Sequence, residues 1–400
     1  MTNNNQIVTE GKKYVMNTYG RLPMALVKGK GTMVWDSEGK SYLDFVTGLA
    51  VTSLGHSHPE IVQVIKDQAE EMIHSSNLYW IPNQVALAKI LVEKSFADQV
   101  FFCNSGAEAN EGAIKLARIY ARKKFGENKT NIISLKNSFH GRTMATLTAT
   151  GQKKYQKYYD PLPQGFSYIE INNIDELEKA VNENTAALFI EPIQGEGGVY
   201  PVDRDYLLKA REICDKNNAL LVFDEVQCGM GRTGKLFAHE WMGVTPDIMT
   251  LAKSLAAGVP IGAILAKGEI AEAFQPGDHA STFGGNYIAT AVGCKVMEII
   301  TRTGFLEAVI KKSEYFKKGL VKIGEEFGVK GEIRGIGFML GMPLGESAPK
   351  IVEICLKKGL LINCVGGKTL RFLPPLNVKK EEMDKALVII REAFEEQRKQ

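Results

Sequence analysis

Long apolar segments, paired cysteines and an excess of one charge are all missing from this 400-residue chain. No run reaches the roughly 18 apolar residues of a spanning helix, so we expect no membrane contact. Lys and Arg number 49 against 46 Asp and Glu, and a net charge of +3 gives no footprint for nucleic acid. Residues 1–9 lack the apolar core of a signal peptide, and no two cysteines form a Cys-x-x-Cys motif. We therefore expect a cytoplasmic protein with free thiols.

Two short motifs invite site assignments that their surroundings do not support. His56 and His58 lie close together, but no other cluster of ligand-type residues accompanies them, so we expect no metal site. The stretch Gly229–Gly234 matches the Gly-x-Gly-x-x-Gly fingerprint of dinucleotide-binding proteins. That fingerprint requires a strand directly before the glycines and a helix directly after them, and neither is evident here. We expect no nicotinamide cofactor.

Short apolar runs separated by helical periodicity predict an α/β fold. The predicted strands are 100–103, 131–135, 186–190, 220–223, 248–251 and 262–266, and helical patterns include 205–217, 348–358 and 380–397. Residues 1–20 are expected to form an arm, and residues 28–45 a small antiparallel meander. We predict a large domain over residues 50–290 and a smaller α+β domain built from residues 1–49 and 291–400.

The stretch from Leu220 to Leu255 places a carboxylate and an amine at the ends of two predicted strands. Asp224 ends the first apolar run, and Lys253 follows the second. The carboxyl ends of parallel strands meet at one edge of a sheet, so these side chains should face one crevice. A buried Asp and Lys are unfavourable together unless a ligand uses both. Pyridoxal phosphate does so, because its aldehyde takes an amine and its ring nitrogen takes a carboxylate. Two unrelated surface charges are the alternative.

Strand 100–103 runs into a pattern typical of a helix N-terminus. Ser105 and Glu108 have the spacing of a capping box, and apolar residues then repeat at helical intervals. The free amides and the dipole at such an end bind anions, including phosphate. A well-capped structural helix would explain the same sequence, so both interpretations stay open here.

Five phrases together resemble the class III (ω-amino) aminotransferases of pyridoxal-phosphate fold type I, over nearly the whole chain. The phrases are Phe101–Glu111, Phe139–Thr143, Glu191–Glu196, Asp224–Gln227 and Ser281–Asn286. The resemblance implies a mostly parallel central sheet in a large domain, a smaller α+β domain, and pyridoxal 5'-phosphate as the cofactor.

The resemblance also implies roles for individual residues at the cofactor. Lys253 would hold the cofactor and carry a proton, and Asp224 would keep the ring nitrogen protonated. Thr282 would reach the phosphate from a second subunit, which makes the active site a property of a homodimer. The remaining implied cofactor-binding residues are Ser105, Gly106, Ala107, Phe139, Glu225, Val226 and Gln227.

Within the family, the resemblance is greatest to members that act on N2-acetyl-L-ornithine in arginine biosynthesis. It implies transfer of the terminal amino group to 2-oxoglutarate, giving N-acetyl-L-glutamate 5-semialdehyde and L-glutamate. The implied substrate-binding residues are Arg142, Ser281, Glu196, Arg371 and Tyr19. In relatives the glutamate at 196 pairs with the arginine at 371 for the ω-amine and releases it for the dicarboxylate. A fixed structural ion pair is the alternative.

Other functions fit the same phrases. Sibling aminotransferases act on ornithine, succinylornithine or 4-aminobutyrate, and a glutamate-semialdehyde mutase-like enzyme would share the fold. A non-catalytic cofactor-binding protein is disfavoured by the presence of Lys253 and Asp224.

Overall fold

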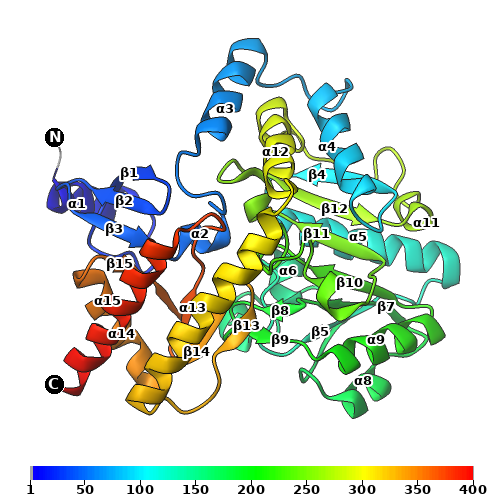
Figure 1. The fold of residues 1–400 in the computed structure, drawn as a ribbon. Helices are drawn as coiled ribbons and strands as arrows, with labels where there is room; N and C mark the ends of the chain where they lie inside the picture. Colours follow the sequence, from blue (N-terminus) through cyan, green and yellow to red (C-terminus); the bar gives the residue numbers. More distant parts are fainter. Residues whose placement is uncertain (1–2, 400) are drawn as a thin grey trace.

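A seven-stranded sheet lies at the centre of the computed structural model, which describes residues 3–399 (Figure 1). Its strands are β4 (Gln99–Cys103), β5 (Asn131–Leu135), β6 (Phe166–Ile169), β7 (Thr185–Ile190), β10 (Leu220–Asp224), β11 (Ile248–Leu251) and β12 (Gly262–Ala266). The strand order is β4-β12-β11-β10-β7-β5-β6. All pairings from β11 to β6 are parallel, whereas β12 runs antiparallel to both β11 and β4. The predicted α/β fold with a mostly parallel sheet is confirmed.

The central strands β7, β10 and β11 are buried along their whole length because helices cover both faces of the sheet. In β10, Leu220 and Val222 point to the face covered by α5, whereas Leu221 and Phe223 point to the face covered by α9. The helices and hairpin strands of this part are α3 (Pro59–Glu71), α4 (Pro82–Glu93), α5 (Gly106–Phe125), α6 (Met144–Ala149), α7 (Lys153–Gln156), α8 (Ile174–Ala180), β8 (Ile193–Gln194), β9 (Tyr200–Pro201), α9 (Arg204–Lys216), α10 (His239–Met242), the 3-10 helix η1 (Lys253–Ala256), α11 (Gly268–Ala271) and α12 (Tyr287–Ile300).

The two ends of the chain meet beside this sheet, at the left of Figure 1. Strand β15 pairs in parallel with β3, and Leu43 and Phe45 lie in one apolar core with residues from 309 to 394. The elements of this part are α1 (Asn4–Tyr14), β1 (Leu26–Lys30), β2 (Met33–Asp36), β3 (Ser41–Asp44), α2 (Thr47–Ala50), α13 (Phe305–Phe327), β13 (Arg334–Ile336), β14 (Met339–Pro343), the 3-10 helix η2 (Gly345–Ser347), α14 (Ala348–Lys357), β15 (Leu360–Leu361), β16 (Asn363–Val365), β17 (Thr369–Phe372) and α15 (Lys380–Arg398). The meander of β1, β2 and β3 is confirmed as antiparallel. The domain boundaries at residues 50 and 290 stay a prediction.

The predicted amino-terminal arm contains a helix, α1, that the sequence did not indicate. The Asn3 side chain caps it by accepting a hydrogen bond from the amide of Gln6. Asn4 is buried, and its side-chain oxygen Oδ1 accepts hydrogen bonds from the amide of Ala25 at 2.9 Å and from the hydroxyl of Ser37 at 2.8 Å. The helix therefore depends on polar contacts with residues 25–37, which a search for apolar periodicity cannot detect.

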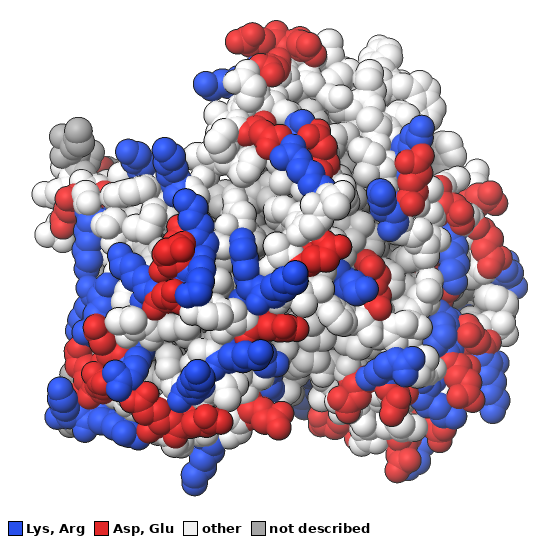
Figure 2. All heavy atoms as spheres, in the orientation of Figure 1, with Lys and Arg blue, Asp and Glu red and all other residues white. Residues whose placement is uncertain are grey.

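Acidic and basic side chains alternate over the face drawn in Figure 2, in keeping with the balanced charge of the sequence. Among residues 3–399, no helix combines the length and the apolar character needed to cross a bilayer.

Candidate active site

Asp224 and Lys253 lie in the wall of one cavity of about 400 Å³. Strands β10 and β11 are parallel neighbours with Asp224 opposite Thr250, so the chain reaches Lys253 just beyond the same edge of the sheet. The predicted site residues that share this wall are Ser105, Gly106, Ala107, Phe139, Arg142, Glu196, Asp224, Val226, Gln227 and Lys253. Residues from five separate segments of the sequence thus converge on one crevice, as expected at the carboxyl edge of a parallel sheet.

Lys253 occupies a strained position at the start of η1. Its φ is +44°, a left-handed conformation that is uncommon outside glycine and costs about 1–3 kcal/mol. Burial, followed by the positive charge of Arg371, lowers the pKa of the Lys253 amine below its ordinary value. A lower pKa leaves more of the amine neutral near pH 7, and only the neutral amine can act as a nucleophile or as a base. The strain and the pKa shift therefore both fit a reactive rather than a structural lysine.

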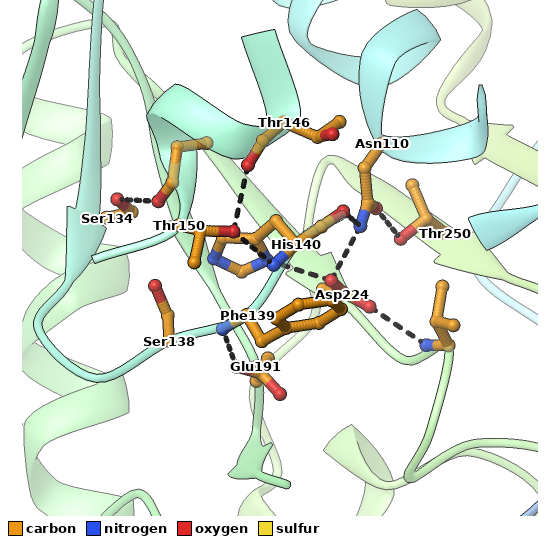
Figure 3. Close-up of polar contacts among 12 residues, drawn as sticks. Asn110, Ser134, Ser138, Phe139, His140, Thr146, Thr150, Glu191, Asp224 and Thr250 are labelled. Atoms are coloured by element: carbon orange, nitrogen blue, oxygen red, sulfur yellow. Dashed lines mark hydrogen bonds and ion pairs between the residues drawn. The ribbon is translucent and has the colours of Figure 1, made fainter. Parts of the chain in front are cut away.

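Three hydrogen-bond donors fix the orientation of the Asp224 carboxylate (Figure 3). Asn110 Nδ2 and His140 Nδ1 lie 2.7 and 2.8 Å from Oδ2, and the amide of Val226 donates to Oδ1 at 3.0 Å. Asn110 is itself held, because the Thr250 hydroxyl donates to its Oδ1 at 2.6 Å. The sequence prediction missed Asn110, His140 and Thr250, although Asn110 falls within a quoted phrase and on the buried face of α5.

Glu191 ties two loops of the cavity together and was also missed. Its carboxylate accepts from the amide of Phe139 at 2.8 Å and from the amide of Gly195 at 3.1 Å (Figure 3 shows the first). Burial raises the pKa of Glu191 to about 7. The loop carrying Phe139 and the turn leading to Glu196 are thus held to the end of β7 by one side chain.

The start of α5 presents backbone amides to the cavity. Gly106 and Ala107 are the first two helical residues, so their amides have no acceptor within the helix. A Cβ on Gly106 would lie 2.6 Å from Val226 Cγ1, which explains why glycine stands there. The predicted capping box is half right. Ser105 Oγ accepts from the amide of Glu108 at 3.1 Å. The Glu108 carboxylate, however, reaches one residue further back, to the amide of Asn104 at 2.6 Å.

The arginine predicted from the carboxyl-terminal part, Arg371, is completely buried and donates to three side chains. Its Nη1 lies 2.7 Å from Glu196 Oε1 and 3.0 Å from Gln227 Oε1, and its Nε lies 3.3 Å from Asn363 Oδ1. Burial opposes ionisation of Glu196, but the charge and hydrogen bond of Arg371 outweigh it and lower the pKa of that carboxyl. The two side chains therefore form an ion pair in the present conformation.

Arg142, unlike Arg371, lies in the wall of the cavity, and its side chain is held differently. It is exposed, and its guanidinium carbon is 4.0 Å from the centre of the Tyr155 ring and 5.3 Å from that of Phe139. Within residues 3–399 it forms no ion pair and no hydrogen bond. The site therefore has one arginine whose N–H groups are free, in the wall of the cavity, and one paired arginine that contacts the wall residues Glu196 and Gln227.

Five predicted site residues lie outside this wall: Arg371, which contacts the wall residues Glu196 and Gln227, and four others. The carboxylate of Glu225 turns away from it and accepts from the amides of Ala238 and His239 at 2.5 and 2.8 Å. Ser281 and Thr282 lie in a loop above the cavity, where Ser281 Oγ accepts from Asn104 Nδ2 at 3.1 Å. Tyr19 is 69% exposed and lines a separate groove near the amino terminus. Roles for these residues in binding stay predictions.

Solved structures of aminotransferases share this fold. An ornithine aminotransferase from Toxoplasma gondii, whose active site holds pyridoxal phosphate at partial occupancy, superimposes with a TM-score of 0.95 at 32% identity, covering 100% of this chain and 97% of that one. An N-acetylornithine aminotransferase from Stenotrophomonas maltophilia gives a TM-score of 0.85 at 38% identity, covering 98% and 99%. The molecule thus has the architecture of a fold type I aminotransferase.

Sequence comparison narrows the class to a family. The family described as aminotransferase class-III matches residues 14–394. An acetylornithine aminotransferase from Caldanaerobacter subterraneus subsp. tengcongensis is 55% identical over 391 residues, covering 98% of this chain and 99% of the relative. One from Methanocaldococcus jannaschii is 51% identical over 388 residues, covering 97% and 98%. The chain belongs to the class III aminotransferase family and is a transaminase.

Proposed function

We propose that this enzyme transfers the terminal amino group of N2-acetyl-L-ornithine to 2-oxoglutarate, with pyridoxal 5'-phosphate as cofactor. The products are N-acetyl-L-glutamate 5-semialdehyde and L-glutamate, which places the reaction in arginine biosynthesis. The observation that carries the proposal is one cavity whose wall contains Lys253, the unpaired Arg142 and Glu196, the carboxylate that is paired with the buried Arg371. The 55% identity to a relative with this activity supports the same reaction.

The residues of the cavity fit the proposed cofactor. Lys253 offers an amine to the aldehyde, Asp224 offers a carboxylate to the ring nitrogen, and the amides of Gly106 and Ala107 offer donors to the phosphate. When bound, pyridoxal phosphate supplies an aldehyde that exchanges amines and a ring that accepts an electron pair from the substrate. Phe139 would lie against the ring, and the remaining implied contacts come from Ser105, Val226, Gln227 and the partner's Thr282, whereas the carboxylate of Glu225 turns away from the cavity.

Lys253 would move the proton that the transfer requires. A neutral amine takes a proton from the substrate carbon and, once charged, delivers it to a neighbouring carbon. Asp224 would hold a proton at the ring nitrogen, and Asn110 and His140 would keep its carboxylate pointed there. The lowered pKa of Lys253 favours the neutral amine, which is the form that takes the first proton.

The two arginines would divide the substrates between them. Acetylornithine carries one carboxylate, far from its reacting amine, which Arg142 would bind as a bidentate pair. 2-Oxoglutarate carries a second carboxylate beside its reacting carbon, and Arg371 would bind that one. A bare Arg371 beside the uncharged chain of acetylornithine would be unfavourable, so Glu196 would neutralise it in that half of the reaction. Ser281 and Tyr19 are further proposed contacts for the substrate.

We propose a homodimer as the working form, in the reducing environment of the cytoplasm. Leu78, Tyr79, Trp80 and Phe283 are all at least 60% exposed. Their loops lie together, because Asn77 Nδ2 donates to the carbonyl oxygens of Ser281 and Gly284 at 3.0 Å each. Apolar side chains gathered in this way are typical of a covered surface, and a second copy would bring Thr282 to its partner's site. All six cysteines are free, as a reducing compartment requires.

A half-reaction screen tests the proposed substrate. Cofactor-loaded enzyme is mixed separately with acetylornithine, ornithine, succinylornithine and 4-aminobutyrate, and the loss of cofactor absorbance is followed by stopped flow. We expect the largest rate constant divided by dissociation constant for acetylornithine. A larger value for any of the other three amines would reassign the enzyme to that sibling activity.

A further inference from the structure

We propose that Tyr155 is a positioning residue that sets substrate specificity by holding Arg142 on its aromatic face. The inference rests on the proposed function, in which Arg142 binds the carboxylate of the amine donor. It adds a residue that lies outside the wall of the cavity and in none of the five family phrases.

The geometry around Arg142 carries the inference. Its guanidinium carbon lies 4.0 Å from the centre of the Tyr155 ring, which is van der Waals contact with the face of the ring. Within the described chain, no carboxylate and no carbonyl oxygen competes for its N–H groups. The preceding residue, Lys154, also approaches the ring, with its Nζ 4.7 Å from the centre, but it does not line the cavity.

Stacking is the form of support that leaves an arginine free to bind a ligand. The guanidinium group is planar, and its five N–H groups point outward in that plane. A carboxylate partner would occupy those N–H groups, as Glu196 does at Arg371. An aromatic ring attracts the same cation through its face and leaves the edges open for a bidentate carboxylate. Tyr155 therefore restrains the Arg142 side chain without competing with the substrate.

The segment that carries Tyr155 is anchored to the loop that carries Arg142. Helix α7 has only four residues, but the glutamines on either side of Tyr155 fix it. Gln152 Nε2 donates to the carbonyl oxygen of Ser138 at 2.9 Å, directly before Phe139. Gln156 Nε2 donates to the carbonyl oxygen of Thr150 at 3.0 Å. The segment that carries the ring is thus tied by hydrogen bonds to the residues on both sides of the loop with Arg142.

The ring also braces the proposed stacking residue of the cofactor. Phe139 and Tyr155 meet edge to face, with centroids 5.9 Å apart and an interplanar angle of 82°. Loss of the ring would therefore remove its contact with Phe139 as well as its contact with Arg142. The first contact bears on the cofactor and the second on the substrate carboxylate. The readout must separate the two effects.

The test compares two amines in single-turnover reactions of the cofactor-loaded enzyme. Acetylornithine carries the carboxylate, and N-acetylputrescine is the same ω-amine without it. In Tyr155→Leu we expect the rate constant divided by dissociation constant for acetylornithine to fall about 5- to 30-fold, which corresponds to roughly 1–2 kcal/mol of cation–π interaction. The loss should lie in the dissociation constant, and the value for N-acetylputrescine should stay unchanged.

Two further variants make the test specific. Tyr155→Phe keeps the aromatic face and should retain the wild-type preference. Tyr158→Leu removes a tyrosine of the same segment that is 86% exposed and whose ring lies 4.6 Å from Lys157 Nζ, and it should have no effect. If Tyr155→Leu folds poorly, judged by circular dichroism and cofactor content, Tyr155→Met is measured in its place.

The outcomes separate this inference from the proposed function. Equal losses with both amines, or an equal loss in Tyr155→Phe, would overturn the inference and leave Tyr155 a structural residue. An unchanged preference in Tyr155→Leu would overturn it as well. Wild-type enzyme that does not prefer acetylornithine to N-acetylputrescine would instead contradict the proposed role of Arg142, and the inference would fail with it.

Discussion

Two arginines at the site, the buried Arg371 and the exposed Arg142, are held in opposite ways. Arg371 is fully buried and uses its donors on Glu196, Gln227 and Asn363. Arg142 is exposed, stacks on Tyr155 and leaves its donors unused. A buried charge without a partner is strongly unfavourable, whereas an exposed charge is solvated by water until a ligand binds. The difference indicates that Arg142 is always available to a carboxylate and that Arg371 must first be released.

The environment of Lys253 is tied to one of these arginines and not to the other. The charge of Arg371 contributes to the lowered pKa of the Lys253 amine, whereas Arg142 is not among the charges that affect it most. Pairing and release of Arg371 would therefore also change how readily Lys253 accepts a proton. Lys253 takes part in both half-reactions of the proposed mechanism, so the effect of its substitution is the reference for the arginine variants.

The largest effect is expected for Lys253→Ala, which should abolish both half-reactions equally. General acid–base catalysis alone contributes about 10²–10⁴ to the rate, and attachment of the cofactor adds to it. Single-turnover rates with acetylornithine and with 2-oxoglutarate measure the loss. As a control, borohydride reduction of the wild-type enzyme followed by peptide mass spectrometry should find the cofactor on Lys253, and a different lysine would refute the assignment.

A smaller and one-sided effect is expected for Arg371→Ala. The half-reaction with 2-oxoglutarate should slow about 10- to 150-fold, since a hydrogen bond to a charged group is worth about 1.5–3 kcal/mol. The half-reaction with acetylornithine should change little, because Arg371 is neutralised there. Arg142→Leu serves as the counterpart and should slow both halves. Equal losses in the two halves of Arg371→Ala would remove the distinction between the arginines.

The smallest effect concerns stability and pH in the cofactor-free protein. The folded pKa of Lys253 lies below the ordinary value of 10.5, so between the two values the unfolded chain binds more protons and stability rises with pH. Lys253→Met should therefore raise the melting temperature at pH 7 by about 1–3 °C, with an advantage that shrinks towards pH 10.

The background of each arginine variant sharpens that measurement. Arg371→Met should reduce the advantage of Lys253→Met, because it removes a charge that lowers the pKa of the lysine. Arg142→Met should leave the advantage as it is. A thermal-shift series from pH 7 to pH 10 separates the two, and an identical response in both backgrounds would contradict the electrostatic assignment.

The sequence predicted the parts of this site that follow strands directly. Asp224 and Lys253 each end an apolar run, and parallel strand ends must meet at one edge of the sheet. Glu225 was assigned to the same group, but successive side chains along an extended segment point to opposite sides, and its carboxylate turns away.

Contacts between side chains from distant segments could not be predicted in the same way. Asn110 reaches Asp224 across 114 positions, and Tyr155 meets Arg142 through a short helix with no apolar periodicity. Such contacts depend on the packed fold and leave no spacing rule in the sequence. The pairing of Glu196 with Arg371, 175 positions apart, was available only through the family resemblance.

The central claim, that Arg371 is held in reserve by Glu196 while Arg142 stays free, is tested most directly in Glu196→Ala. The measurement is the ratio of single-turnover rate constants for glutamate and acetylornithine, compared with the ratio in the wild-type enzyme. Removal of Glu196 frees Arg371 for the carboxylate beside the reacting carbon of glutamate and leaves it bare beside acetylornithine. We predict that the ratio rises by at least about tenfold, given the value of a charge-assisted contact. If both rates change by the same factor and the ratio stays constant, the ion pair is structural and the claim is wrong.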